Sequence, residues 1–243
     1  MLAYTRYELL RTFRNRRFVV FAFGFPLVLY VLIAAPNRHV HDLGHSGLSA
    51  PLYFMVGLLT FGTMNGMLSA GSRIAAERSG GWNRQLRITP LLPRTYFWTK
   101  VLTGYAMSLL TIALLYAAGY ALGVRLPAGR WLEMTGLILV GLIPFAALGI
   151  LLGHLVSADS IGPALGGSTA LLAFLGGVWF PLGGHGALHA IGQALPSYWL
   201  VQAAHIGDGG AGWGVHAFAV LAAWAVGATI LARRAYVRDT AKA

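Results

Sequence analysis

The chain has 243 residues, of which 57% are hydrophobic and 10% are charged, and its mean hydropathy is +0.65. Soluble domains carry roughly 25% charged residues, so this composition excludes a soluble domain and predicts an all-α integral membrane protein. The absence of cysteine excludes disulfides and metal–thiolate sites, and the net charge of +11 gathers at the ends of apolar segments instead of forming a basic face for nucleic acid.

Residues 1–17 predict an amphipathic helix that lies on the inner membrane surface, with arginines around an apolar side that Arg6 interrupts. The apolar side consists of Leu2, Leu9, Leu10 and Phe13. A basic start before an apolar run is also typical of a cleaved signal peptide. The run at 18–35 is longer than the usual signal core, which favours a retained span.

Six apolar runs are long enough to predict transmembrane helices. They cover residues 18–35, 51–71, 97–123, 133–156, 161–182 and 213–232. With a cytoplasmic N-terminus, the inner segments hold fifteen basic residues and the outer loops hold three. The positive-inside rule therefore predicts that both termini are cytoplasmic.

The span interiors hold essentially no charged side chain, which weakens the hypothesis of an ion-driven carrier. The only lysines are Lys100 and Lys242, and neither follows the glycine-rich turn of a P-loop. The HExxH pattern of metalloproteases is also absent. We therefore expect no catalytic residue, no cofactor and no enzymatic activity in this chain by itself.

The densest polar stretch, residues 76–89, lies between the second and third spans and has a helical pattern that ends before a proline. Trp82 and Leu86 lie four residues apart on one face, and Arg84 and Arg87 project from another. One interpretation is a solvated loop whose arginines set the topology. The other is a docking element for a cytoplasmic partner.

Two stretches resemble the sequence patterns of ABC-2 type exporter permeases. The first is ERSGGWNRQLRITPLLPRTYFWTKVL, in which Glu-Arg, a glycine, a leucine and a Thr-Pro turn precede the third span. The second is LGILLGHLVSADSIGPALGGSTALLAFLGGVWFPL, followed by LPSYWLVQA, which is similar to the fourth and fifth spans and the Pro-x-Tyr segment of that family. The order of the spans extends this resemblance over nearly the whole chain.

The resemblance implies that residues 76–89 form a coupling helix in a groove of a separate ATP-binding subunit. Six residues of this chain match the contact positions: Glu77, Arg78, Trp82, Arg84, Leu86 and Arg87. The resemblance also implies the interfacial helix of residues 1–17 and a re-entrant outer segment at 184–207. That segment is apolar and too short for two crossings.

From this resemblance we expect residues 1–243 to form one permease domain of a bacterial ATP-driven exporter in the cell membrane. The expected partners are two copies of an ABC ATP-binding protein, which would hold ATP and Mg²⁺, a second permease copy or close paralogue, and the lipid bilayer. Short outer loops and an uncharged interior favour a lipophilic or amphipathic substrate, such as a drug or natural product removed by efflux. A secondary transporter or channel and a non-transporting membrane scaffold are the alternatives.

A group of histidines lies in the first outer loop, where His39, His41 and His45 surround Asp42. Imidazole and carboxylate suit zinc or copper, but the spacing HVHDLGH matches no established metal-binding template. Polar loop residues without a metal are the expected interpretation.

Overall fold

The computed structural model describes most of the chain, with short gaps that fall in connecting segments. The described residues are 2–40, 49–82, 85, 89, 92–179, 182, 186–206 and 213–241. Helix is the only regular secondary structure in these ranges, which confirms the all-α class. The predicted loop residues His41, Asp42 and His45 lie outside them.

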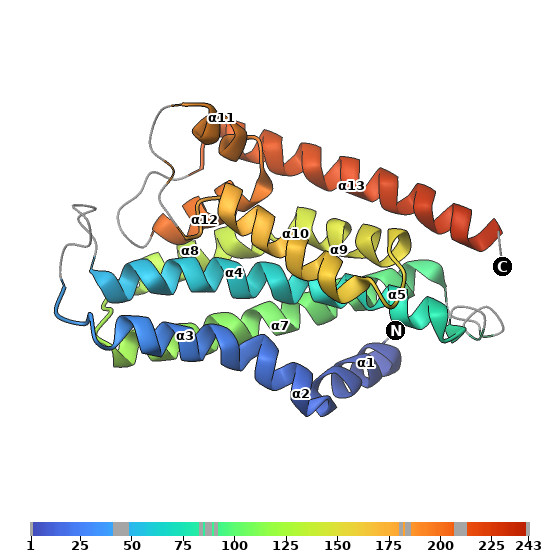
Figure 1. The fold of residues 1–243 in the computed structure, drawn as a ribbon, viewed down its shortest axis with the longest axis horizontal. Helices are drawn as coiled ribbons and strands as arrows, with labels where there is room; N and C mark the ends of the chain where they lie inside the picture. The colour runs from blue at the N-terminus through green and yellow to red at the C-terminus, as the bar shows by residue number, and fades with distance from the viewer. Residues whose placement is uncertain are drawn as a thin grey trace.

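The chain begins with the short helix α1 (Leu2–Arg14), which Asn15 separates from the first apolar helix. Asn15 Oδ1 accepts a hydrogen bond from the Phe18 backbone N–H at 3.2 Å, so Asn15 acts as an N-cap for the helical stretch that begins at Arg16. This stretch consists of α2 (Arg16–Val19), the π-helical turn η1 (Val20–Gly24) and α3 (Phe25–Ala34). In Figure 1, α1 lies at the end of the bundle that also holds α5.

The helix α4 (Ala50–Ser72) is the centre of the bundle, since it packs against α3, α7, α9, α10 and α12. It continues through α5 (Ile74–Ser79) with a break at Arg73. Gly81 then adopts a φ of 70°, a left-handed conformation that glycine tolerates and that ends a helix. The chain returns along α4 as α7 (Pro93–Ala121), the longest helix in the described residues.

The second half of the chain covers the other side of α4. Helices α8 (Ala128–Gly141) and α9 (Ile143–Leu155) form one apolar stretch, and α10 (Ile161–Leu175) follows. The short helices α11 (Ala187–Gln193) and α12 (Pro196–His205) fall in the predicted re-entrant segment. The long helix α13 (Val215–Ala241) closes the fold by packing against α9 (Figure 1).

Four helices in the described ranges are long and apolar enough to cross a membrane: Ala50–Ser79, Pro93–Ala121, Ala128–Leu155 and Val215–Asp239. Two further apolar helices, Val20–Ala34 and Ile161–Leu175, are shorter. The second of these ends before the predicted boundary at 182, because Gly177 has a φ of 79° and turns the chain. The multi-span character is confirmed, and the full set of six crossings stays a prediction.

Glycines allow α4 and α9 to cross at very short range. A Cβ atom on Gly71 would lie 2.4 Å from the backbone carbon of Gly149, and one on Gly153 would lie 2.6 Å from the Gly71 carbonyl oxygen. Because real Cβ atoms do not approach backbone atoms this closely, only glycine fits at these positions. Small residues of this kind let helix backbones meet in a bilayer, where van der Waals packing replaces the hydrophobic effect.

Gly71→Ala is therefore expected to destabilise the bundle by about 1–3 kcal/mol, the usual cost of overpacking a tight interface. The matched control is Gly136→Ala, because a Cβ atom on Gly136 meets nothing within 4 Å. Thermal unfolding of both variants in detergent measures the difference. Equal melting temperatures for the two variants would contradict the close crossing.

Candidate functional site at the junction of α1, α5 and α7

Lys100 on α7 is the centre of a buried ion-pair cluster. Its side chain is 1% exposed, and its Nζ lies 2.7 Å from Glu8 Oε1 and 2.6 Å from Glu77 Oε1. Glu8 belongs to α1 and Glu77 to α5, so one ammonium group joins three separate elements. A charge can be buried at tolerable cost only when it is paired and hydrogen-bonded, and Lys100 meets both conditions.

Two further side chains complete the cluster around Glu77. Arg11 Nη1 lies 3.1 Å from Glu77 Oε1 and 3.7 Å from Glu8 Oε2, and the Tyr96 hydroxyl donates a hydrogen bond to Glu77 Oε2. The Arg11 side chain is 49% exposed, so water weakens its ion pairs far more than those of Lys100. The Lys100 pairs are therefore the strong part of the cluster.

The inward side of α1 is polar along its length. Thr5 and Thr99 share a hydrogen bond of 3.2 Å between their hydroxyl groups, and Arg73 donates a hydrogen bond to the buried Thr12. Arg73 also lies over the Phe18 ring, 4.5 Å from its centroid. These contacts fix α1 against α7 and the end of α4 by hydrogen bonds and ion pairs.

Arg78 joins the opposite side of α5 to the second half of the chain. Its Nη1 donates to the carbonyl oxygens of Gly153 at 3.1 Å and His154 at 2.7 Å, at the C-terminus of α9. Its Nη2 lies 2.9 Å from Asp239 Oδ1 on α13, and Asp239 Oδ2 lies 2.8 Å from His154 Nδ1. A cation at unsatisfied carbonyls complements the negative end of the helix dipole.

Glu77 and Arg78 thus hold α5 between two clusters. Adjacent helical residues point about 100° apart, so Glu77 reaches α1 and α7 while Arg78 reaches α9 and α13. Both were predicted as contacts of an ATP-binding subunit, and the structure engages both side chains within the chain. A displacement of α5 would therefore act on helices from both halves of the fold.

Trp82, one of the six predicted contact residues, lies beside α1. It is only partly exposed, and its indole N–H is buried. The pKa of the nearby Tyr4 hydroxyl is raised to about 12, mainly by burial and also by the negative charges of Glu77 and Glu8, while the Trp82 N–H and Arg11 oppose the shift. The other three predicted contact residues, Arg84, Leu86 and Arg87, lie outside the described residues.

Sequence reasoning missed six residues of these clusters: Glu8, Arg11, Tyr96, Lys100, His154 and Asp239. Lys100 and Glu77 lie within helices apolar enough to span a membrane, so the expectation of uncharged helices needs correction at this end of the bundle. The sequence did contain a signal for these ion pairs, because acidic residues are rare in this chain, which has only seven carboxylates in total. A lone glutamate on a basic helix and a lone lysine in an apolar helix were candidates for a pair.

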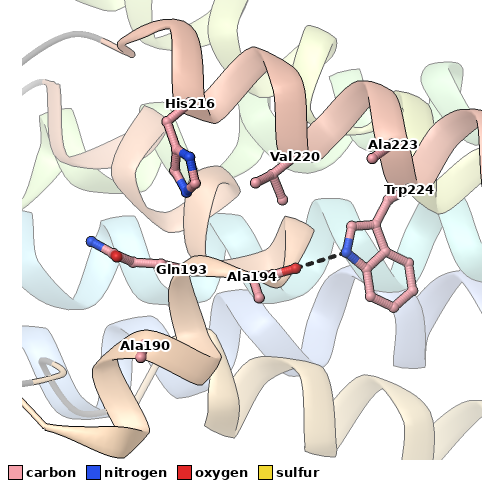
Figure 2. Close-up of a pocket in the computed structure, with 7 residues that line it drawn as sticks. All are labelled: Ala190, Gln193, Ala194, His216, Val220, Ala223 and Trp224. Carbon is pink, nitrogen blue, oxygen red and sulfur yellow. Dashed lines mark hydrogen bonds between the residues drawn. The ribbon is translucent and has the colours of Figure 1, made fainter.

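A pocket of about 330 Å³ lies at the other end of the bundle, between the α11–α12 connection and α13 (Figure 2). The Trp224 indole N–H donates to the Ala194 carbonyl oxygen at 2.8 Å and closes one side of it. Alanine and valine side chains form most of the remaining wall, and Gln193 and His216 supply polar groups. In the parts of the chain that the structure describes, no three histidine or acidic residues gather as metal ligands would.

The fold and its charged junction define a multi-pass helical membrane protein without a nucleotide-binding domain in the described residues. The chain belongs to the ABC-2 type transporter family, whose sequence model matches residues 1–207. It is 29% identical over 207 residues to the protein named "Putative transport permease YvfS" of Bacillus subtilis (strain 168), a match that covers 83% of this chain and 80% of that protein.

These matches confirm the family resemblance. The chain is the membrane permease component of an ABC-2 type transporter, the part that lacks the ATPase domain. The matched range contains Glu8, Glu77 and Lys100, whereas Asp239 on α13 lies beyond it.

Proposed function

We propose that this chain is the membrane-spanning subunit of an ATP-driven exporter that works as a dimer with two separate ATP-binding subunits. Family membership supports a partner of this kind, since the permease component lacks the ATPase domain. The observation that carries the proposal is the position of α5. Its last four residues are the first four of the predicted docking segment 76–89, and ion pairs hold it on both sides.

In this proposal the ATP-binding subunit moves residues 76–89, and α5 passes the movement on. Glu77 transmits it to α1 and α7 through Lys100, and Arg78 transmits it to α9 and α13 through the His154 carbonyl and Asp239. Packed helices respond as rigid bodies, so a small shift at the junction changes the access to a pathway between two copies of the chain.

We further propose that both termini are cytoplasmic and that six helices cross the cell membrane. In Figure 1, α1, α5 and the C-terminal end of α13 lie at the same end of the bundle. The basic residues of α1, of α5 and of the last turns of α13 lie at this end, whereas Arg38 and Arg125 lie in connections at the other end and Arg130 lies in the first turn of α8. This distribution supports the orientation by the positive-inside rule.

The topology is tested by reporter fusions at Ala243. A cytoplasmic reporter is expected to be active there, and a periplasmic reporter is expected to be inactive. A control fusion within the segment 41–48 should give the reverse pattern. Periplasmic activity at Ala243 would refute the proposed orientation.

The outer pocket supports a lipophilic or amphipathic substrate, such as a drug or natural product, over a small polar ion. Its wall is mainly alanine, valine and tryptophan, and Gln193 and His216 provide hydrogen-bonding groups beside that wall. Apolar lining with a few placed polar groups is typical of sites for organic molecules.

Trp82→Ala is expected to weaken retention of the ATP-binding subunit by about 2 kcal/mol or more, because aromatic anchors often dominate an interface. The measurement is co-purification with the tagged chain, together with the melting temperature of the chain alone. The control is Trp98→Ala, since Trp98 is 58% exposed on α7. A lower melting temperature with unchanged retention would instead assign Trp82 to internal packing against α1.

A further inference from the structure

The outward side of α1 and α2 carries cations and apolar side chains together. Six exposed residues form this side, which we call the α1 surface: Arg6, Tyr7, Leu10, Phe13, Arg14 and Arg16. The three large apolar side chains are between 37% and 55% exposed. The only carboxylate of α1, Glu8, is 1% exposed and faces Lys100.

This arrangement is the reverse of a surface helix in a soluble protein. There the apolar stripe packs inward and the polar residues face water. In α1 the inward residues Glu8 and Thr12 are buried and polar, while Leu10 and Phe13 face out. An outward apolar side flanked by arginines fits the interface of a bilayer, where the headgroups meet the acyl chains.

We propose that the α1 surface binds anionic phospholipids, and that the bound lipid stabilises α5 through the Glu8–Lys100–Glu77 ion pairs. The guanidinium groups of Arg6, Arg14 and Arg16 would contact the headgroup phosphates. The apolar side chains would lie among the upper parts of the acyl chains. Each arginine near an anionic membrane surface strengthens such binding by roughly fivefold.

Two observations favour lipid as the partner of the α1 surface: its arginines lack acidic partners among the described residues, and it adjoins the exposed apolar side chains of the first apolar helix. Arg6, Arg14 and Arg16 form no ion pair with any carboxylate that the structure describes, so their charge is available to an outside partner. The Phe13 ring stacks on Phe23 of η1, with ring centroids 6.2 Å apart. The α1 surface is thereby joined to the exposed apolar side chains of the first apolar helix.

The link from the lipid to α5 follows from the arrangement of α1, which carries arginines on its outward side and Glu8 on its inward side. Arg6, Arg14 and the buried Glu8 belong to the same helix of 13 residues, and Arg16 follows at the start of α2. Glu8 holds Lys100 at 2.7 Å, and Lys100 holds Glu77 at 2.6 Å. Lipid that immobilises α1 therefore reduces the freedom of α5 by way of the buried Lys100 ammonium group, and the more exposed Arg11 adds a direct ion pair from α1 to Glu77.

The binding step is tested with the full chain in phosphatidylcholine bilayers that contain spin-labelled phosphatidylglycerol or spin-labelled phosphatidylcholine. The wild type is expected to immobilise the anionic lipid preferentially at low salt. The variant Arg6→Gln/Arg14→Gln/Arg16→Gln should weaken this preference by roughly fivefold for each charge removed. The control Arg6→Lys/Arg14→Lys/Arg16→Lys keeps the charge and should keep the preference.

A triple glutamine variant with the wild-type preference would overturn the binding site. The same holds if the lysine variant loses as much as the glutamine variant, because charge would then not be the cause. Both variants alter exposed side chains, and their elution as single species on gel filtration checks that they are folded.

The transmission step is tested by amide hydrogen exchange of α5 in bilayers with and without phosphatidylglycerol. In the wild type we expect slower exchange at Ile74–Ser79 when the anionic lipid is present. The triple glutamine variant should show no difference between the two bilayers. Equal exchange in both bilayers for the wild type would overturn the link to α5.

Discussion

Lys100→Met is expected to destabilise the protein by about 3–5 kcal/mol, because Glu8 and Glu77 would remain buried without their shared ammonium group. Both carboxylates are almost fully buried, so water cannot replace the lost partner. Thermal unfolding of the purified variant in detergent measures the effect.

The control for this prediction removes the charges together. The variant Glu8→Gln/Lys100→Met/Glu77→Gln leaves no uncompensated carboxylate in the cluster, so much of the lost stability should return. The Arg11 side chain is partly exposed, so water can solvate its charge in the triple variant and Arg11 should not destabilise the chain. If Lys100→Met were as stable as the wild type, the buried ion-pair cluster would be refuted.

Arg78→Ala is expected to give the second large effect. It leaves two α9 carbonyl oxygens and Asp239 without their guanidinium partner, at a cost of about 2–3 kcal/mol after allowance for the partial exposure of Arg78. Because the contact joins α5 to α9 and α13, ATP turnover in the complex should also lose its dependence on substrate.

The variant Arg78→Lys distinguishes the contribution of the positive charge from that of the planar guanidinium group. Lysine keeps the positive charge but cannot reach two carbonyl oxygens and a carboxylate with one planar group, so only part of the stability should be recovered. Arg94→Ala is the control, since Arg94 is an exposed arginine at the start of α7. Equal melting temperatures for Arg78→Ala and Arg94→Ala would contradict the role of Arg78.

The helical class and most helices could be predicted from the sequence because a bilayer requires long apolar runs with internally satisfied backbones. The predicted spans 51–71 and 97–123 lie almost entirely within helices of the structure, which extend further at the end of the bundle that holds α5. The helix of the fifth run ends at Leu175, before the predicted boundary at 182, for a local reason. Gly177 turns the chain with a positive φ, and apolar composition does not reveal that turn.

The charged junction could not be predicted, because its partners are far apart in the sequence. Lys100 pairs with Glu8 across 92 positions, and Arg78 pairs with Asp239 across 161. In the sequence alone, Lys100 and Arg78 look like the other basic residues that set the topology, and nothing indicates which acidic residues they pair with. The interruption of the apolar side of α1 by Arg6 has a structural reason, since Leu10 and Phe13 of that side are exposed together with Arg6 and Arg14.

The family could be recognised from two stretches with distinct local structure: the first contains the positive-φ turn at Gly81, and the second contains Gly149 and Gly153, which pack closely against α4 and the start of α5. The roles of the docking residues could not be established in the same way. Glu77 and Arg78 bind within the chain, Trp82 lies beside α1, and their contact with an ATP-binding subunit stays a prediction.

The central claim is that a separate ATPase drives this permease through the α5 junction. Its most direct test is purification of the tagged chain from its native membranes, followed by identification of co-purifying proteins and assay of ATP turnover. We predict that a P-loop protein accompanies the wild type, that the pair hydrolyses ATP, and that the stripped chain does not. ATP hydrolysis by the chain alone would contradict this account, as would substrate transport driven by an ion gradient without any ATP-binding partner.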